Sequence, residues 1–191
     1  FTISFNSNDG SAVDNQTTVN GKLSSLPMPT KSGYTFDGWY QNEDLSGDEV
    51  TTDTVFDGDA TLYAKWTIIS YNITWNLDGG SISSGSQTNS ADYGASVTLP
   101  TVTKTGYTFA GWTVTSGGNA VNVVDGKFTM PAGAVTITAN WTADTYDVVY
   151  NANAPDGTSF TGSLPSNGTA TFGESFTIDS TKLSLDGYTF K

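Results

Sequence analysis

One stretch of this sequence crowds together carboxylates, the side chains best suited to bind a cation or hydrolyse a glycoside. Its members are Glu43, Asp44, Asp48, Glu49, Asp53, Asp57 and Asp59. Calcium needs about six to eight converging oxygens, and a glycosidase needs a pair of carboxylates. The Asp-x-Asp-x-Asp-Gly spacing of a calcium loop is absent, and the aligned stretch 115–119 is Thr-Ser-Gly-Gly-Asn. We therefore expect solvated acidic loops, no tightly bound metal, no catalytic residue and no enzymatic activity.

Lysines are the other reactive group, because a buried Lys beside Asn and an acid can form an isopeptide cross-link. Lys31 and Lys104 each stand two residues before a motif glycine, and Lys182 stands five before Gly187. All three lie in connectors rich in Pro, Thr or Ser, so we expect them to be exposed rather than cross-linked.

The overall composition excludes several classes of function. The 191 residues contain no Cys and no His, which excludes thiol nucleophiles, disulfides, Ser-His-Asp triads and His-ligated metals. The formal net charge of -12 repels nucleic acid and anionic membrane surfaces. No apolar stretch is long enough for a membrane-spanning helix. We expect no cofactor, no nucleic-acid partner and no direct membrane insertion of this segment.

A motif that recurs along the chain carries most of the remaining information. Gly-Tyr-Thr-Phe-x-Gly-Trp occurs at 33–39 and 106–112, and its first four residues recur at 187–190. A motif that returns together with its surroundings is typical of a repeated structural unit. The surroundings do return: each copy has an alternating opening stretch that ends at Asn and leads into an Asp-Gly turn, which is typical of a strand entering a hairpin.

The repeats divide the chain into three copies. Copy one spans 1–67, copy two spans 71–142 in diverged form, and copy three spans 146–191. Each contains a further glycine before its motif: Gly21, Gly94 and Gly173. Copies one and two close with Thr-x-x-Ala-x-Trp, at 61–66 and 136–141. Copy three has no such strand, so we expect it to be C-terminally incomplete, and frayed unless a strand completes it in cis or from another chain.

The motif aromatics are the expected core. A unit of about 70 residues without disulfides has to bury large rings to be stable. We expect the structural core of the repeats to contain Tyr34, Phe36, Trp39, Trp66, Tyr107, Phe109, Trp112, Trp141, Tyr188 and Phe190. The motif glycines are Gly33, Gly38, Gly106, Gly111 and Gly187. Gly38 and Gly111, each directly before a Trp, are expected at a bulge or a close backbone contact. The linkers 67–70 and 142–145 hold four residues each and are too short to act as flexible tethers. We therefore expect an elongated rod in which neighbouring units make modest contact.

The Gly-Tyr-Thr-Phe-x-Gly-Trp motif, followed by the closing Thr-Leu-Tyr-Ala-Lys-Trp at 61–66, resembles the Listeria–Bacteroides repeat. It is similar to the B-repeat of internalin B and related bacterial surface proteins. The resemblance covers copy one almost end to end and copy two in diverged form. It implies a mainly β, β-rich α+β unit related to the β-grasp fold, repeated in tandem along secreted or wall-attached proteins. It supplies no catalytic residues.

These observations predict a non-enzymatic extracellular module of a bacterial surface or secreted protein, acting as a stalk, spacer or adhesion segment. The alternative is a binding module that engages a host protein or glycan, or a second copy of itself, through exposed aromatics or acidic loops. Burial of the motif rings favours the spacer, whereas a solvent-facing row of Tyr and Trp favours glycan binding.

Overall fold

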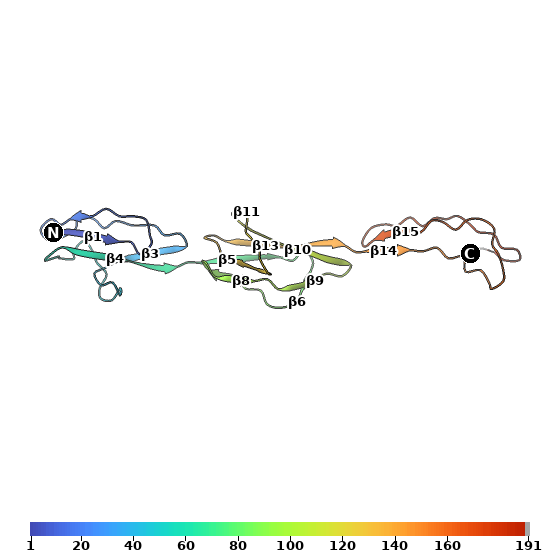
Figure 1. The fold of residues 1–191 in the computed structure, drawn as a ribbon, viewed down its shortest axis with the longest axis horizontal. Coiled ribbons are helices and arrows are strands. Elements are labelled where there is room, and N and C mark those ends of the chain that lie inside the picture. The colour runs from blue at the N-terminus through green and yellow to red at the C-terminus, as the bar shows by residue number, and fades with distance from the viewer. Residues whose placement is uncertain (190–191) are drawn as a thin grey trace. The chain divides into compact units, whose positions relative to one another are not determined.

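The computed structural model describes residues 1–189, and it is built from β-strands: 44% of the chain is strand, and these residues form no helix. None of them therefore forms a helix that could cross a membrane. The strands in chain order (Figure 1) are β1 (Thr2–Asn6), β2 (Gln16–Thr17), β3 (Tyr34–Tyr40), β4 (Ala60–Ile68), β5 (Ser70–Asn76), β6 (Ser81–Ser84), β7 (Ser90–Asp92), β8 (Ser96–Thr98), β9 (Thr101–Thr103), β10 (Tyr107–Ser116), β11 (Asn119–Ala120), β12 (Lys127–Thr129), β13 (Val135–Ala143), β14 (Thr145–Val148) and β15 (Gly168–Thr171).

The expectation of a mainly β protein is confirmed, whereas the helical component implied by an α+β class is not found in residues 1–189. The connectors show why. In copy one, Pro27 and Pro29 remove backbone donors that a helix needs. In copy two the connector is rich in Val and Thr and forms β8 and β9 on either side of Pro100.

The chain divides into two compact units that do not follow the order of the sequence. Unit 1 comprises 1–76, 85–100 and 113–138, and unit 2 comprises 77–84, 101–112 and the residues from 139 onward. Strands β10 and β13 contribute residues to both. The predicted boundaries of the three copies stay a prediction, and we keep the copies as names for their sequence ranges.

In copy one, which lies in unit 1, the opening and closing strands lie side by side. The sheet has the order β2-β1-β4-β3, so the closing strand β4 sits between β1 and β3 (Figure 1). The β1–β4 pairing is parallel, with Ile3 opposite Ala60 and Asn6 opposite Tyr63. The antiparallel pairing of β3 with β4 shifts register between Phe36 and Trp39. The predicted bulge at the Gly before Trp39 is thus present.

The core of copy one follows from the alternation along these strands. Every second residue of β1 and β4 points inward, which buries Ile3, Leu62 and Ala64. They join residues from the connectors and from β3 in one cluster, completed by Leu23, Trp39, Val50 and Phe56.

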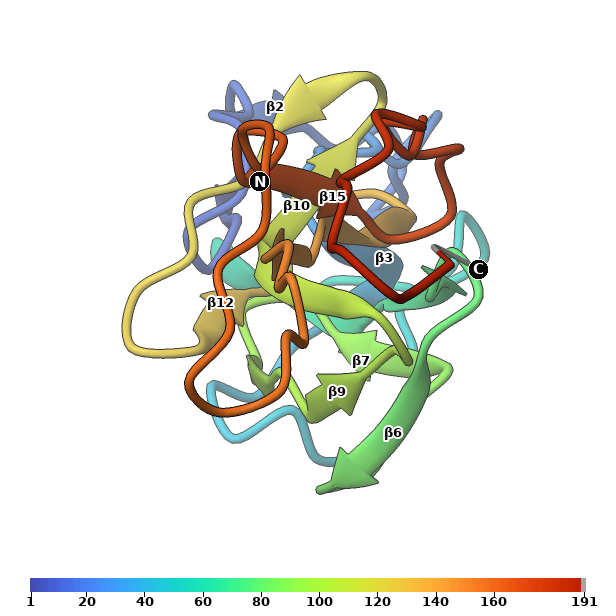
Figure 2. The same cartoon turned by 90° about the vertical axis from the view of Figure 1, so that its right-hand side faces the viewer.

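Copy two uses the same pairing of opening and closing strands. β5 pairs in parallel with β13, with Ile73 opposite Val135 and Asn76 opposite Thr138. The sheet has the order β11-β10-β13-β5-β7. Copy two also contains two separate two-stranded sheets. In one, β8 pairs with β12, and in the other β6 pairs with β9, which lies beside it in Figure 2.

Copy three is the simplest part of the described chain. Its opening strand β14 pairs antiparallel with β15, from Thr145 opposite Thr171 to Val148 opposite Gly168. This sheet has two strands. None of the residues 145–189 is fully buried.

Candidate functional site

The acidic side chains lie at the surface, and several have local partners of their own. Asp44 accepts hydrogen bonds from the hydroxyl of Ser46 at 2.6 Å and from its backbone N–H at 3.0 Å. Both bonds hold the pKa of Asp44 below its usual value, and the bond from the hydroxyl has the larger effect. Asp53 pairs with Lys22 at 3.2 Å. No three carboxylates among residues 1–189 converge on a point that could hold a metal ion. The described contacts of Asp44 and Asp53 order turns and connectors.

The aromatics of the copy-one motif pack into and around its core. Trp39 is 0% exposed, and its indole Nε1 donates to the carbonyl of Pro27 at 2.8 Å. Phe36 contacts Trp39 and Trp66 edge to face, each at a centroid distance of 5.4 Å. Phe5 approaches Trp39 from the opening strand at 4.8 Å. Such contacts add to the stabilisation that burial of the rings provides.

The same rings in copy two are more accessible. Phe109 contacts Trp112 at 5.3 Å and Trp141 at 5.4 Å, yet its side chain is 37% exposed. Trp112 is half-buried, in contrast to Trp39. In copy three, Tyr188 is 62% exposed, and Phe190 lies outside the described residues. Phe109 and Tyr188 were expected in the core, and neither is buried.

The segment that follows each motif explains the difference between Trp39 and Trp112. In copy one the chain turns back, and the N–H of Val50 donates to the carbonyl of Trp39 at 2.8 Å. Val50 and Phe56 are buried there, and a β-carbon on Gly38 would overlap the carboxylate of Glu49. In copy two, β10 instead runs on to Ser116 and turns into β11. Apart from Gly111 and its two chain neighbours, no described residue has an atom within 4 Å of the place a β-carbon of Gly111 would take.

Two lysines expected at the surface are instead half-buried against aromatic rings. Lys31 Nζ lies 4.7 Å from the ring centre of Tyr34 and 5.9 Å from that of Trp66, and it donates to the carbonyl of Asn8 at 2.8 Å. Lys104 repeats the arrangement in copy two, at 4.2 Å from Tyr107.

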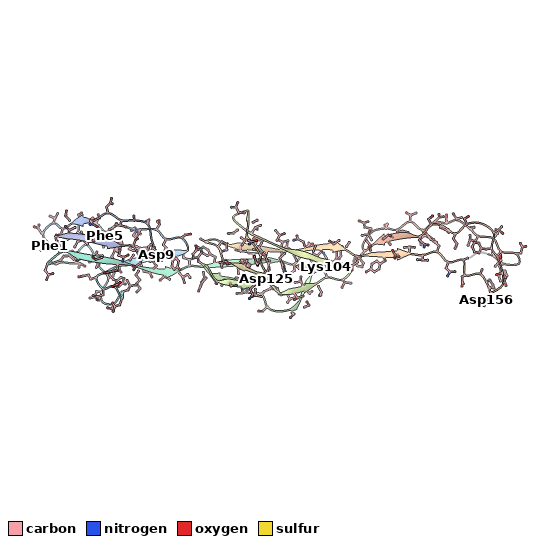
Figure 3. All side chains as sticks on the ribbon, in the orientation of Figure 1. Phe1, Phe5, Asp9, Lys104, Asp125 and Asp156 are labelled. Carbon is pink, nitrogen blue, oxygen red and sulfur yellow. The ribbon has the colours of Figure 1, made fainter. Side chains whose placement is uncertain are left out.

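The carboxylates nearest these lysines come from the turns after the opening strands. Asp9 lies 3.8 Å from Lys31, and Asp78 lies 3.4 Å from Lys104. Asp9 and Lys104 are labelled in Figure 3. The half-buried lysine ties the turn after the opening strand to the motif, and its attraction to the rings is a cation–π interaction.

Two of the five motif glycines, Gly33 and Gly106, lie where one copy meets the next. All five motif glycines adopt positive φ, between 76° and 119°, a region that L side chains disfavour. At Gly33 there is a second reason for glycine. The ring of Tyr93, from copy two, covers its α-carbon so closely that a β-carbon would overlap the ring. Tyr93 also contacts Tyr34 edge to face at 6.0 Å. These residues all lie in unit 1.

Backbone hydrogen bonds hold copies one and two together at the same place. The N–H of Ile69 donates to the carbonyl of Gly33 at 2.9 Å, and the N–H of Tyr93 donates to the carbonyl of Ile69 at 2.9 Å. β4 ends at Ile68 and β5 begins at Ser70, so Ile69 alone separates the strands. Ser70 Oγ donates to Asp92, next to Tyr93.

A second joint, within unit 2, reproduces the first. Phe172 covers the α-carbon of Gly106 and contacts Tyr107 edge to face at 5.5 Å. Asp144 takes the place of Ile69. Its N–H donates to the carbonyl of Gly106 at 2.9 Å, and its carbonyl accepts from the N–H of Phe172 at 2.8 Å. We call Gly33, Tyr34, Ile69 and Tyr93 the first joint, and Gly106, Tyr107, Asp144 and Phe172 the second joint.

Comparison with known proteins assigns the family. Residues 1–65 match the model of the Listeria-Bacteroides repeat domain, and residues 71–145 match the model of the divergent InlB B-repeat domain. Residues 1–65 are therefore a Listeria–Bacteroides repeat, and residues 71–145 are a divergent InlB B-repeat.

Relatives of this repeat protein are longer than the chain. Internalin H of Listeria monocytogenes is 34% identical over 165 residues, which cover 85% of the chain and 28% of internalin H. A "Putative membrane protein" of Evansella cellulosilytica is 34% identical over 200 residues, which cover 100% of the chain and 28% of that relative. The chain thus spans less than a third of the length of these relatives. No solved structure matches it.

Within these repeats, sequence reasoning missed Tyr93 and Phe172, the two rings that make the joints. A signal for them exists, because each directly precedes the glycine shared by the copies, Gly94 or Gly173. Asn20 holds the equivalent place before Gly21, so the position is aromatic in the copies that follow another copy in this chain.

Proposed function

We propose that this chain is a non-enzymatic, extracellular stretch of a bacterial surface or secreted protein, and that it acts as a stalk or spacer. The support for location comes from the family and from relatives named internalin H and "Putative membrane protein". The support for a spacer role comes from the two joints.

The repetition of the joint is the observation that carries the proposal. Each joint combines a one-residue link, two backbone hydrogen bonds and a ring seated on a glycine. A spacer has to limit bending between successive repeats, and a short link held by such contacts restrains it far more than a flexible linker would. We infer an elongated, β-grasp-like arrangement of repeats from these local restraints.

Engagement of a host protein or glycan is the second candidate. The exposed rings of Phe109 and Tyr188 favour it, because solvent-facing aromatics can stack on a partner. The indoles of Trp39, Trp66 and Trp141, however, donate to backbone carbonyls of their own copies. These tryptophans are therefore already used within the repeats, which favours the spacer.

The test measures how tightly the first joint restrains the repeats on its two sides. Since the chain has no native Cys, Val19→Cys and Val124→Cys introduce two exposed spin-label sites, one in copy one and one in copy two. Pulsed electron-spin measurement should give a narrow distribution of distances between the labels. Tyr93→Ala, which removes the ring over Gly33, should broaden that distribution.

Tyr146→Ala is the matched control, because Tyr146 is an exposed tyrosine that takes no part in the first joint. It should leave the distribution unchanged. A wild-type distribution as broad as that of Tyr93→Ala would show that the joint does not restrain the repeats, and the spacer proposal would fall.

A further inference from the structure

The chain contains two sulfur atoms, one in each of its methionines, because it has no cysteine. Met28 belongs to copy one and is 80% exposed, whereas Met130 belongs to copy two and is 0% exposed. A thioether is readily oxidised to a sulfoxide, and accessibility decides which methionine of a folded protein reacts. The two sulfurs of this chain therefore differ in the property that governs their reaction with a dissolved oxidant.

The exposure of Met28 by itself needs no special explanation. Met28 is the most exposed large hydrophobic residue in the described chain, ahead of Ile178 at 72%, but single apolar side chains at a surface are normal. What sets Met28 apart is that its side chain lies in water while the backbone on both sides of it is held by the core of copy one.

The residues before and after Met28 provide this support. The carbonyl of Pro27 accepts a hydrogen bond from Nε1 of the buried Trp39 at 2.8 Å. Pro29 is buried, and a proline ring also fixes the backbone φ angle of its own residue. A chemical change at the tip of the Met28 side chain therefore acts on a segment that other residues hold in place.

Copy two shows why this segment leaves its methionine in water. The connector of each copy contains Leu-Pro-x-x-Thr-Lys, which aligns Met28 with Thr101 and Pro29 with Val102. Thr101 and Val102 pair with β6 as part of β9. Pro29 has no N–H to offer to such a ladder, and the segment around it forms no strand. Met28 therefore lies outside any sheet.

The surroundings of the Met28 side chain have room for a further atom. Met28 borders a groove of about 350 Å³, whose other walls are the loop from Ser11 to Gln16 and the two neighbouring prolines. Because Met28 is largely exposed, an oxygen added to its sulfur faces water and displaces no packed atom. Oxidation would turn an apolar wall of this groove into a polar one.

Met130 provides the opposite case within the same chain. Its N–H donates to the carbonyl of Ala95 at 2.8 Å, and its carbonyl accepts from the N–H of Gly94 at 2.9 Å. Since Met130 has no exposed surface, an oxidant reaches its sulfur only when copy two opens locally. A sulfoxide there would bury a polar oxygen among apolar side chains, which is costly without a hydrogen-bond partner.

We propose that Met28 is a reversible oxidation site, at which the folded chain consumes peroxides. A lone pair of the Met28 sulfur attacks one oxygen of hydrogen peroxide, and the S–O bond forms as the O–O bond breaks. The proton of the attacked oxygen passes to the leaving oxygen, which departs as water. The sulfur loses two electrons and the peroxide gains them, so each peroxide yields one methionine sulfoxide and one water.

The reverse step needs a thiol reductant. Methionine sulfoxide reductases return the sulfoxide to the thioether, while two thiols become a disulfide and the oxygen leaves as water. The chain itself has no thiol, so a separate protein supplies the electrons. The exposure of Met28 makes its sulfoxide as accessible to such an enzyme as its thioether is to peroxide.

The test treats the whole chain with hydrogen peroxide and follows oxygen uptake at each methionine by mass spectrometry of its peptides. Met28 should react as fast as the methionine of a free peptide with the sequence of residues 24–32, within a factor of about three. Met130 should react at least about a hundredfold more slowly in the folded chain, because its reaction waits for local opening. In denaturant, where both sulfurs are accessible, the two rates should become equal.

Two further measurements show whether the site is reversible and harmless to the fold. After oxidation of Met28, hydrogen exchange of the β1 and β4 amides should stay unchanged, and reductases for both sulfoxide epimers should restore the original mass. Met28→Leu should remove the fast oxygen uptake by the folded chain. Met130→Leu is the matched control and should leave the fast uptake in place.

Oxidation of Met28 no faster than that of Met130 in the folded chain overturns the proposal, as does fast uptake that survives Met28→Leu. Loss of exchange protection in copy one on oxidation, or a sulfoxide that the reductases do not reduce, likewise overturns a reversible site on a folded chain. None of these readouts depends on bending between repeats, so this proposal and the spacer proposal can fail separately.

Discussion

The ring of Tyr93 lies on the α-carbon of Gly33, with no room for a β-carbon between them. The two residues come from successive repeats, and the backbone around them is joined by hydrogen bonds through Ile69. Phe172 and Gly106 have the same relationship in the second joint. Glycine is therefore needed at these positions both for its positive φ and for the absence of a side chain.

The first prediction separates these two requirements. Gly33→Ala should lower the free energy of unfolding, measured by hydrogen exchange at the β4 and β5 amides, by about 1–3 kcal/mol more than Gly94→Ala, because the ring must also be displaced. Gly94 is the matched control: its φ is 77° against 78° at Gly33, and nothing lies near its missing β-carbon.

Removing the ring should remove the difference. In a Tyr93→Ala background, Gly33→Ala should cost no more than Gly94→Ala, because only the backbone strain remains. Equal costs of the two glycine substitutions in the wild-type background would contradict the importance of the ring contact.

The second prediction concerns the two motif tryptophans. Trp39→Ala should destabilise copy one by about 3–5 kcal/mol, since it empties a fully buried site and orphans the Pro27 carbonyl. Trp112→Ala should cost clearly less, because Trp112 is already half-buried. Hydrogen exchange of the β1 and β13 amides reports each copy separately, which matters because a chain of several units need not unfold in one step. A larger loss for Trp112→Ala would mean that the loop around Val50 does not protect Trp39.

The sequence predicted the strands and the bulge at Gly38, because alternation, turn residues and spacing are local properties. It did not predict the unequal burial of Trp39 and Trp112, which depends on dissimilar segments after identical motifs. The roles of Tyr93 and Phe172 were not predicted, because each ring packs on a glycine of the preceding repeat and does not disturb the sequence pattern of its own repeat. Lys31 and Lys104 were expected in water because they lie in connectors. Part of their cover, Trp66 and Trp141, comes from distant strands, and the tyrosine three residues after each lysine gave no sign that its ring would pack on the lysine.

The third prediction concerns pH. Hydrogen bonds from Ser46 lower the pKa of Asp44, and those from Thr181 lower the pKa of Asp179 in the same way. A lowered pKa in the folded state contributes stability above the usual carboxyl pKa, and that contribution is lost as pH falls through the folded value. Carboxyl titration by NMR should therefore place the midpoints of both aspartates below the usual value.

The matched substitutions test the cause. Ser46→Ala should raise the pKa of Asp44 only part of the way, because the backbone N–H of residue 46 still donates, and it should not move Asp179. Thr181→Ala should do the converse. If Ser46→Ala left the titration of Asp44 unchanged, the hydroxyl would not be the main cause of the shift.

The fourth prediction is that Lys31 stabilises its repeat through the rings it lies on and the carbonyl it binds. Lys31→Met keeps most of the apolar length of the side chain but removes the cation and its hydrogen bond to Asn8, and it should cost about 1–2 kcal/mol. Lys22→Met is the control, because Lys22 makes an exposed ion pair with Asp53 worth about 0–1 kcal/mol.

Salt further distinguishes the contributions of Lys22 and Lys31 to stability. About 1 M NaCl should screen most of the Lys22 contribution but leave most of that of Lys31, whose side chain is only 22% exposed. The measurement is hydrogen exchange of the β1 and β4 amides at low and high salt. A loss for Lys31→Met that vanishes in salt would show an ordinary surface charge, and the half-buried position over Tyr34 and Trp66 would then contribute nothing to stability.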